Sequence, residues 1–207
     1  MSATKFTEIQ VFTAFDRPYG KTYGKWTVEW WRWALSMPKS SCPLLDDTGE
    51  KAGTNQPEKD VWFLAGIFGT EDATIQPHRN VTIPSDRSIL FPVINCEANS
   101  IEYPHLKTDD ELLEHVKRDE NNIIRKDVFL NNKRLSVQRI SSDPPLFDLT
   151  LCKENGLDTK AATTRAAADG YYVFLKPLPR GVYELYFRGT CESGRLNTAA
   201  TYSLTIN

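Results

Sequence analysis

The clearest fold signal in this sequence is the stretch from Tyr171 to Thr190, which reads YYVFLKPLPRGVYELYFRGT. Apolar and polar residues alternate with a period of two on both sides of Pro179-Arg180-Gly181. Proline at a turn fixes φ and glycine tolerates unusual φ values, so this tripeptide is typical of a turn between two strands. A third run of the same period, TYSLTI, follows at 201–206. The sequence therefore predicts strands at 171–178, 182–189 and 201–206.

Shorter runs of the same kind precede this region. They indicate strands at 61–69, 81–84, 88–95, 124–130, 134–140 and 147–152, and an edge strand at 9–15. The run at 61–69, VWFLAGIFG, is apolar almost throughout and predicts a central strand covered on both faces. Asn131-Asn132 predicts a tight hairpin turn, because asparagine tolerates positive φ. Pro92 must lie at a bulge or an edge, because it donates no ladder hydrogen bond.

Two segments have helical periodicity instead. GKWTVEWWRWALSM at 24–37 ends before Pro38 and places apolar side chains on two faces, which predicts a helix buried on most sides. Thr108-Asp-Asp-Glu111 is a capping box and predicts a surface helix over about 108–121. The remaining long segments, 39–59 and 153–168, are expected to be loops. We therefore predict a mainly β, single-domain protein over 1–207, an antiparallel β-sandwich of jelly-roll-like or immunoglobulin-like topology with these two helices as excursions.

Charge and composition argue against several classes of partner. The 207 residues contain 25 Lys and Arg against 27 Asp and Glu, so no basic field favours a nucleic acid or an anionic membrane. No stretch approaches the roughly 18 apolar residues that span a bilayer, and the first residues lack the pattern of a signal peptide. We expect a cytoplasmic protein, or an extracellular one if a signal was removed. We expect no cofactor and no metal, because no Cys-x-x-Cys pair, HExxH motif or phosphate-binding loop occurs.

Several motifs resemble those of an uncharacterised family of microbial proteins. They are YGKWTVEWWRWALSMP at 23–38, LDDTG at 45–49, VWFLAG at 61–66, LFPVIN at 90–95 and DGYYVFLKPL at 169–178. Together they cover nearly the whole chain. The resemblance implies family membership but no activity, fold or catalytic residue, and many members carry a secretion signal that this chain lacks.

The candidate ligand-binding residues come from the Trp-rich helix, the long loop and one strand end. They are Glu29, Trp30, Arg32, Asp46, Gln56 and Glu97. An exposed row of tryptophans could bind a sugar ring, but helical spacing with aliphatic neighbours favours a core role. Glu29 has Arg32 at i+3 or Lys25 at i-4 as a partner in an ordinary solvated pair.

Two Cys-Glu dipeptides, at Cys96 and Cys191, follow predicted strands. If they meet at one end of the sheet, the two thiols could form a disulfide or, with their neighbouring carboxylates, hold a metal. The usual interpretation in a cytoplasmic protein is that all four cysteines are free thiols.

These observations favour a non-catalytic module that binds a small, carbohydrate-like molecule or a protein partner. One alternative is a structural homo-oligomer that pairs through edge strands such as 9–15 and 201–206. Another is a hydrolase near the Trp-rich helix that uses Glu29 or Glu97, with two of the carboxylates of Glu29, Asp46, Asp47 and Glu97 flanking a glycosidic bond.

Overall fold

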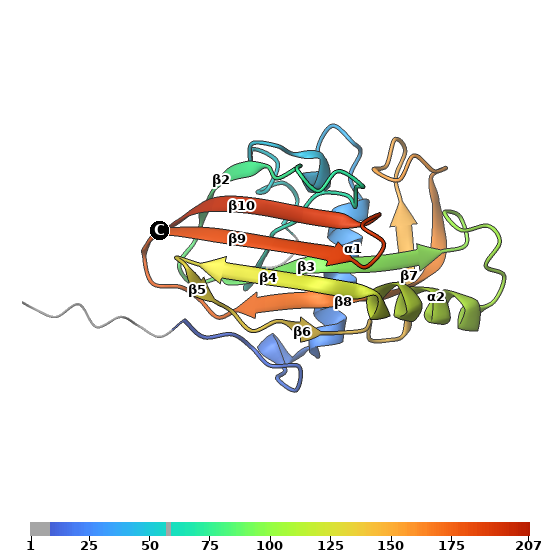
Figure 1. Ribbon diagram of the computed structural model, residues 1–207, viewed down its shortest axis with the longest axis horizontal. Helices are drawn as coiled ribbons and strands as arrows, with labels where there is room; N and C mark the ends of the chain where they lie inside the picture. The colour runs from blue at the N-terminus through green and yellow to red at the C-terminus, as the bar shows by residue number, and fades with distance from the viewer. Residues whose placement is uncertain (1–8, 57–58) are drawn as a thin grey trace, which may run out of the picture.

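The computed structural model describes residues 9–56 and 59–207 and shows two β-sheets packed together (Figure 1). Its helices are η1 (Pro18–Gly20), α1 (Tyr23–Leu35), η2 (Pro43–Leu45) and α2 (Asp109–Asn121). Its strands are β1 (Val61–Phe63), β2 (His78–Ile83), β3 (Ser88–Asn99), β4 (Ile123–Leu130), β5 (Lys133–Arg134), β6 (Gln138–Arg139), β7 (Leu146–Leu151), β8 (Ala162–Leu175), β9 (Gly181–Cys191) and β10 (Asn197–Ile206). The predicted β-sandwich with a buried Trp-rich helix is confirmed.

Both sheets contain five strands and both are mixed. The first has the order β1-β3-β8-β6, with β7 also paired to β8, and the second has the order β2-β10-β9-β4-β5. Most pairs are antiparallel, as predicted, but β1 runs parallel to β3 and β2 runs parallel to β10. The first parallel pair arises because the chain crosses from β1 to β2 in the other sheet and returns to β3.

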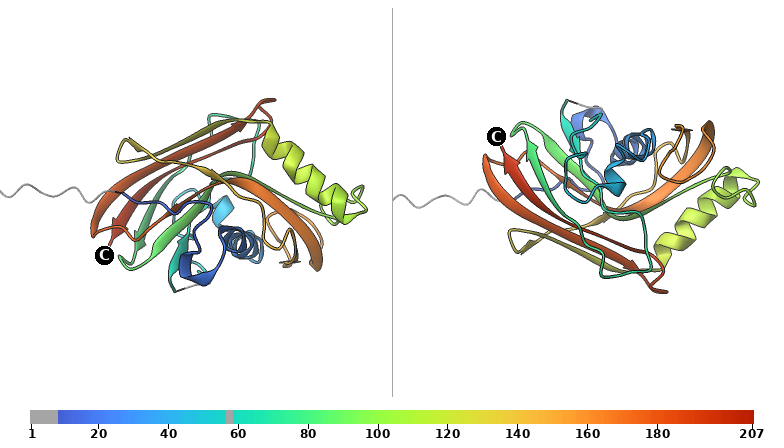
Figure 2. Two further views of the ribbon diagram at one scale, coloured as in Figure 1. Left: turned by 90° about the horizontal axis from the view of Figure 1, so that it is seen from below. Right: turned by 90° about the horizontal axis from the view of Figure 1, so that it is seen from above.

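The sandwich has a third layer on one side only. Figure 2 shows α1 against the outer face of the first sheet, the second sheet on the opposite side, and α2 across one end. Strand β3 is buried along most of its length because side chains of α1 cover one face and the second sheet covers the other. Strand β2 alternates exposed and buried residues because only its inner face is packed. No helix in the described ranges is long and apolar enough to cross a membrane.

Several local signals are confirmed. The capping box of α2 is formed, with the Glu111 side chain and the Thr108 hydroxyl each bonded to the other residue's backbone N–H. Asn131 and Asn132 turn the β4–β5 hairpin with φ values of 47° and 63°. The register between β3 and β8 shifts just after Pro92, which is the bulge that this proline requires.

The apolar run 61–69 behaves differently from its prediction. It forms a strand only over Val61–Phe63, at the edge of the first sheet. From Leu64 to Ile67 the backbone carbonyls accept hydrogen bonds from buried side chains instead of from a neighbouring strand. The donors belong to Trp30, Arg79, Thr198 and Tyr202. A buried backbone satisfied in this way needs no ladder partner.

Three further expectations are corrected. The segment 9–15 makes only an isolated bridge from Val11 to Leu175. The run 201–206 is not an edge, because β10 has β9 on one side and β2 on the other, so it cannot pair with a second subunit. Part of the expected loop 153–168 belongs to β8, which begins at Ala162. Alanine is a poor strand former in isolation. Ala166, Ala167 and Ala168 are buried where the side chains of α1 and α2 pack on the two faces of this sheet.

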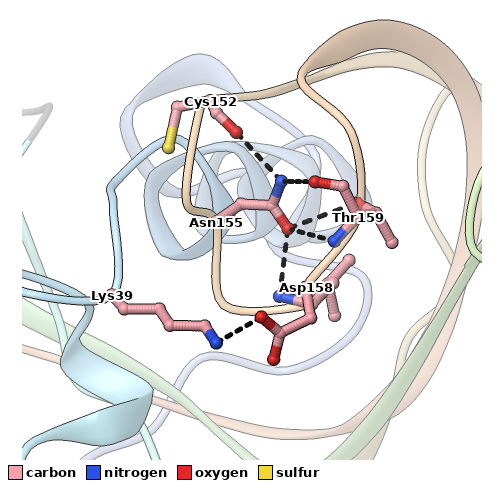
Figure 3. A network of polar contacts seen from close by, with 6 residues as sticks. Lys39, Cys152, Asn155, Asp158 and Thr159 are labelled. Carbon is pink, nitrogen blue, oxygen red and sulfur yellow. Dashed lines mark hydrogen bonds and ion pairs between the residues drawn. The ribbon is translucent and has the colours of Figure 1, made fainter.

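The rest of that loop is held by the side chain of Asn155 (Figure 3). Its amide nitrogen donates to the carbonyls of Cys152 and Thr159, both at 2.9 Å, and its oxygen accepts from the backbone N–H of Leu157. An ion pair between Lys39 and Asp158 joins this loop to the start of the 39–59 loop. This ion pair therefore holds the two loops together beside α1.

Candidate functional site

The four tryptophans of α1 lie in the core. Their exposed fractions are 1% for Trp26, 0% for Trp30, 7% for Trp31 and 3% for Trp33. Three of the indole N–H groups donate to backbone carbonyls, each at 2.9 Å. Buried rings with bonded N–H groups are not available to a ligand, so these tryptophans form no sugar-binding platform.

Glu29 and Arg32 form the solvated pair that their spacing predicts. Nη1 of Arg32 lies 3.6 Å from Oε1 of Glu29, and Arg32 also donates to the carbonyl of Asp148. Both residues line a surface hollow of about 280 Å³ together with Lys21 and Lys25. A partly exposed pair of this kind contributes little to stability.

The side chains of Asp46 and Gln56 stabilise the 39–59 loop through hydrogen bonds. The buried carboxylate of Asp46 accepts three backbone N–H groups at 2.8–3.0 Å, those of Thr48, Gly49 and Lys51. The Gln56 amide bonds the backbone of Phe63 in both directions. The structure thus gives both residues a structural role: Asp46 holds a turn within the loop, and Gln56 holds the loop against β1.

The stability that Asp46 contributes should disappear on acidification. Burial raises the pKa of Asp46, but the hydrogen bonds from Thr48, Lys51 and Gly49 outweigh it and hold the pKa below its usual 3.8. A carboxyl whose pKa is lowered by folding stabilises above its unfolded pKa, and that stability is lost as pH falls through the folded pKa. Urea unfolding between about pH 5 and pH 2 should therefore show a steeper loss for the parent chain than for Asp46→Asn. Equal pH dependence of the two chains would contradict this role.

The two Cys-Glu dipeptides lie near each other at one end of the sandwich, in different surroundings. Cys96 and Cys191 are both free thiols. Glu97 is 5% exposed, and its Oε1 accepts a hydrogen bond from the Asn99 side-chain amide at 2.9 Å. Burial and the negative charge of Glu102 raise the pKa of Glu97 to about 8. Cys191 and Glu192 instead line a cleft of about 630 Å³.

This placement bears on the hydrolase hypothesis. Glu29 lines the hollow on α1, whereas Glu97 is buried and belongs to no part of that hollow. Two carboxylates that cleave a glycosidic bond must face the same substrate. Glu29 and Glu97 do not have this arrangement.

Strands β4, β9, β10 and β2 lie side by side in the second sheet (Figure 1). Their register brings a row of side chains into line on the open face of this sheet. The register pairs Phe129 with Tyr186, Tyr186 with Thr201, and Thr201 with His78. Residues directly opposite each other on neighbouring strands share one face. With Gln76, Asn132 and Glu184, these four residues line a groove of about 330 Å³, which we call the outer groove.

The outer groove combines aromatic surface with hydrogen-bonding groups. The rings of Phe129 and Tyr186 lie 6.2 Å apart at an angle of 32°, and both are half-buried. Nε2 of His78 lies 2.8 Å from the Ser203 hydroxyl, which orients the imidazole. Within the described part of the chain, the Glu184 carboxylate makes no hydrogen bond or ion pair with another residue. A ligand in the groove could therefore use that carboxylate without displacing a protein contact.

No known protein family, curated protein or solved structure matches this chain. Membership of the microbial family that its motifs resemble stays a prediction from the sequence.

Sequence reasoning did not single out the outer groove. The alternation in 124–130 and 182–189 does place Phe129 and Tyr186 on one face of their strands, and that was the available signal. Which residues meet across the strands depends on register and strand order. The parallel position of β2 beside β10, which brings His78 into the row, has no local sequence signal.

Proposed function

We propose that the protein is a binding module for a neutral, carbohydrate-like ligand, and that the outer groove is its site. The observation that supports the proposal is the aromatic pair Phe129 and Tyr186 set among polar side chains on a sheet face that no helix in the described ranges covers. Small-ligand sites typically combine such apolar surface with a few placed polar groups.

The chemistry of a sugar ring suits this groove. Its faces carry C–H groups that can pack on Tyr186, and its edges carry hydroxyl groups that can both donate and accept. The free Glu184 carboxylate accepts from such hydroxyls, and hydrogen bonds to a charged group are worth about 1.5–3 kcal/mol. The volume, about 330 Å³, lies near the lower end for small-ligand sites and fits one or two sugar rings.

The same carboxylate disfavours an anionic ligand. Among the side chains that line the groove, Glu184 is the acidic one and none is Lys or Arg. Two guanidinium groups lie at its margin: Arg188 donates to Oε1 of Gln76 at 3.1 Å, and Arg134 lies over the Phe129 ring at 5.8 Å. A phosphate or carboxylate ligand would meet this charge directly. Because the groove is also open to solvent, we expect dissociation constants in the range of about 10 μM to 1 mM for a matching sugar.

The test is an isothermal titration of the chain with a panel of neutral mono- and disaccharides. We expect Tyr186→Ala to weaken binding about tenfold, because the stacking surface is lost. Glu184→Gln should weaken it by a similar factor, because a neutral amide is a poorer acceptor than a carboxylate.

Phe15→Ala is the matched control, since this ring is 96% exposed and lines no part of the groove. It should bind sugar as the parent does. Absence of binding across the panel, or equal affinity of Tyr186→Ala and the parent, would exclude the outer groove as a saccharide site.

A further inference from the structure

The buried side of α2 carries a group of metal-ligating side chains that the outer groove does not involve. Leu112 and Val116 pack this helix on Ala98 and Ala167, whose small side chains let it approach the sheet closely. On the same helical face, His115 and Asp119 stand four residues apart, one turn along the helix. Cys96 of β3 lies opposite them.

Three potential ligand atoms converge there. Oδ2 of Asp119 lies 3.4 Å from Nε2 of His115 and 3.9 Å from Sγ of Cys96, and the group lies within 4.8 Å overall. A tetrahedral zinc ion with bonds of about 2.0–2.3 Å holds neighbouring ligand atoms roughly 3.3–3.5 Å apart. Small side-chain shifts therefore give the spacing that a metal ion requires.

Hydrogen bonding inside the protein leaves this group unsatisfied. His115 is 9% exposed, and its Nε2, which faces Asp119, is buried without a hydrogen-bond partner. Glu120 is fully buried, and neither of its carboxyl oxygens has a partner. Buried polar atoms are nearly always bonded in native proteins, so such atoms in one place call for an explanation. A bound cation supplies one for Nε2 of His115, whereas the Glu120 carboxyl is not one of its ligands.

The electrostatic surroundings of Cys96 agree with a cation rather than with a nucleophilic thiol. The ionisable groups around its thiol are the carboxyl groups of Glu120, Asp119, Glu97 and Glu102, and the thiol lies 3.9 Å from Oδ2 of Asp119. Reactive cysteines need electropositive neighbours instead. Two guanidinium groups lie nearby: Arg139 is paired with Asp169 at 2.7 Å, and Arg118 is bonded to His115 and lies 3.7 Å from Oδ1 of Asp119.

We propose that Cys96, His115 and Asp119 bind a divalent transition metal ion of the zinc class. One thiolate sulfur, one imidazole nitrogen and one carboxylate oxygen form a mixed set that suits Zn²⁺ or Co²⁺ and not Mg²⁺ or Ca²⁺. Three protein ligands leave a fourth position for water. Asp119 also lines the 630 Å³ cleft beside Cys191, which provides a route from solvent to the site.

Arg118 should oppose metal binding. Its Nη2 donates to Nδ1 of His115 at 2.9 Å, so the ring proton sits on Nε2. Binding through Nε2 moves that proton to Nδ1 and releases the Cys96 thiol proton to solvent. The Arg118 side chain, which is 66% exposed, must then turn away. Removing it should leave metal affinity unchanged or raise it.

The test strips the full chain with a chelator and titrates it with Co²⁺ under reducing conditions. We expect one Co²⁺ per chain, with visible absorption of a tetrahedral site and a near-ultraviolet sulfur-to-cobalt charge-transfer band, and displacement of Co²⁺ by Zn²⁺. Cys96→Ser should lose the charge-transfer band. Asp119→Asn, at a partly exposed position, should keep the fold by circular dichroism and bind at least tenfold more weakly.

Cys191→Ser and Arg118→Gln are the matched controls, and both should keep the charge-transfer band. Absence of the band in the parent chain, or its persistence in Cys96→Ser, would overturn the proposal. The saccharide titration tests the outer groove, which lies on a different face from the metal ligands. A negative result in one experiment therefore does not decide the other proposal. Tyr186→Ala should bind Co²⁺ as the parent does.

Discussion

The variant Arg79→Met is expected to unfold with about 3–5 kcal/mol less free energy than the parent chain. Arg79 is 1% exposed, and its guanidinium donates to three backbone carbonyls, those of Asp46, Ala65 and Gly66. It also donates to the Tyr202 hydroxyl at 2.7 Å. Methionine fills a similar volume but donates nothing, so the Asp46 and Gly66 carbonyls lose partners that water cannot replace, and the Ala65 carbonyl keeps only the Tyr202 hydroxyl.

Urea unfolding measures this effect, and Arg195→Met is the control. Arg195 is exposed, and its substitution should change the unfolding free energy by less than about 0.5 kcal/mol. Arg79→Lys keeps the charge but has a single donor group, so its unfolding free energy should lie between those of Arg79→Met and Arg195→Met. Equal unfolding free energies for Arg79→Met and Arg195→Met would contradict the claim that hydrogen bonds from the Arg79 guanidinium stabilise the fold.

This arrangement also shows where sequence reasoning stops. The run 61–69 has the composition of a central strand, and its first three residues do form one. Beyond Phe63, the backbone carbonyls accept hydrogen bonds from the side chains of Trp30, Arg79, Thr198 and Tyr202. These donors are spread over most of the chain. No local pattern can show that they replace a neighbouring strand.

Features set by neighbouring residues were predictable. The capping box at Thr108, the hairpin turn at Asn131-Asn132 and the bulge after Pro92 each follow from a chemical property of one or two side chains. The sandwich itself follows from the period-two strands. Parallel pairing of β2 with β10 and the strand at Ala162 depend on tertiary packing, so the sequence did not indicate them.

The candidate metal site likewise combines a local sequence signal with contacts that depend on tertiary packing. The sequence pointed to Cys96, but its partners His115 and Asp119 lie on the expected surface helix, and only the packing of α2 against β3 brings them together. The spacing of the two helix residues, four apart, is a signal that one helical face carries both. A single cysteine far away in sequence completes the set, and that juxtaposition has no motif.

The substitution Trp30→Ala is expected to lower the unfolding free energy by about 3–5 kcal/mol, because it leaves a large cavity in the core beneath α1. Trp30 is 0% exposed and packs edge-to-face on Trp31, with ring centroids 4.9 Å apart. Trp30→Phe keeps most of the apolar contact but leaves the Leu64 carbonyl without its donor, so its cost should be about 1–2 kcal/mol. Urea unfolding followed by circular dichroism gives both values.

The same pair of variants separates a structural tryptophan from a ligand-binding one. If the ring serves the core, Trp30→Phe should bind saccharide and Co²⁺ with parental affinity while losing stability. Trp62→Phe, a half-buried tryptophan on β1, is the control and should cost less than about 1 kcal/mol. If Trp30→Phe kept the parental stability but bound saccharide more weakly, Trp30 would have a ligand-binding role and not a structural one. We expect the opposite, because the indole N–H of Trp30 already has its partner inside the protein.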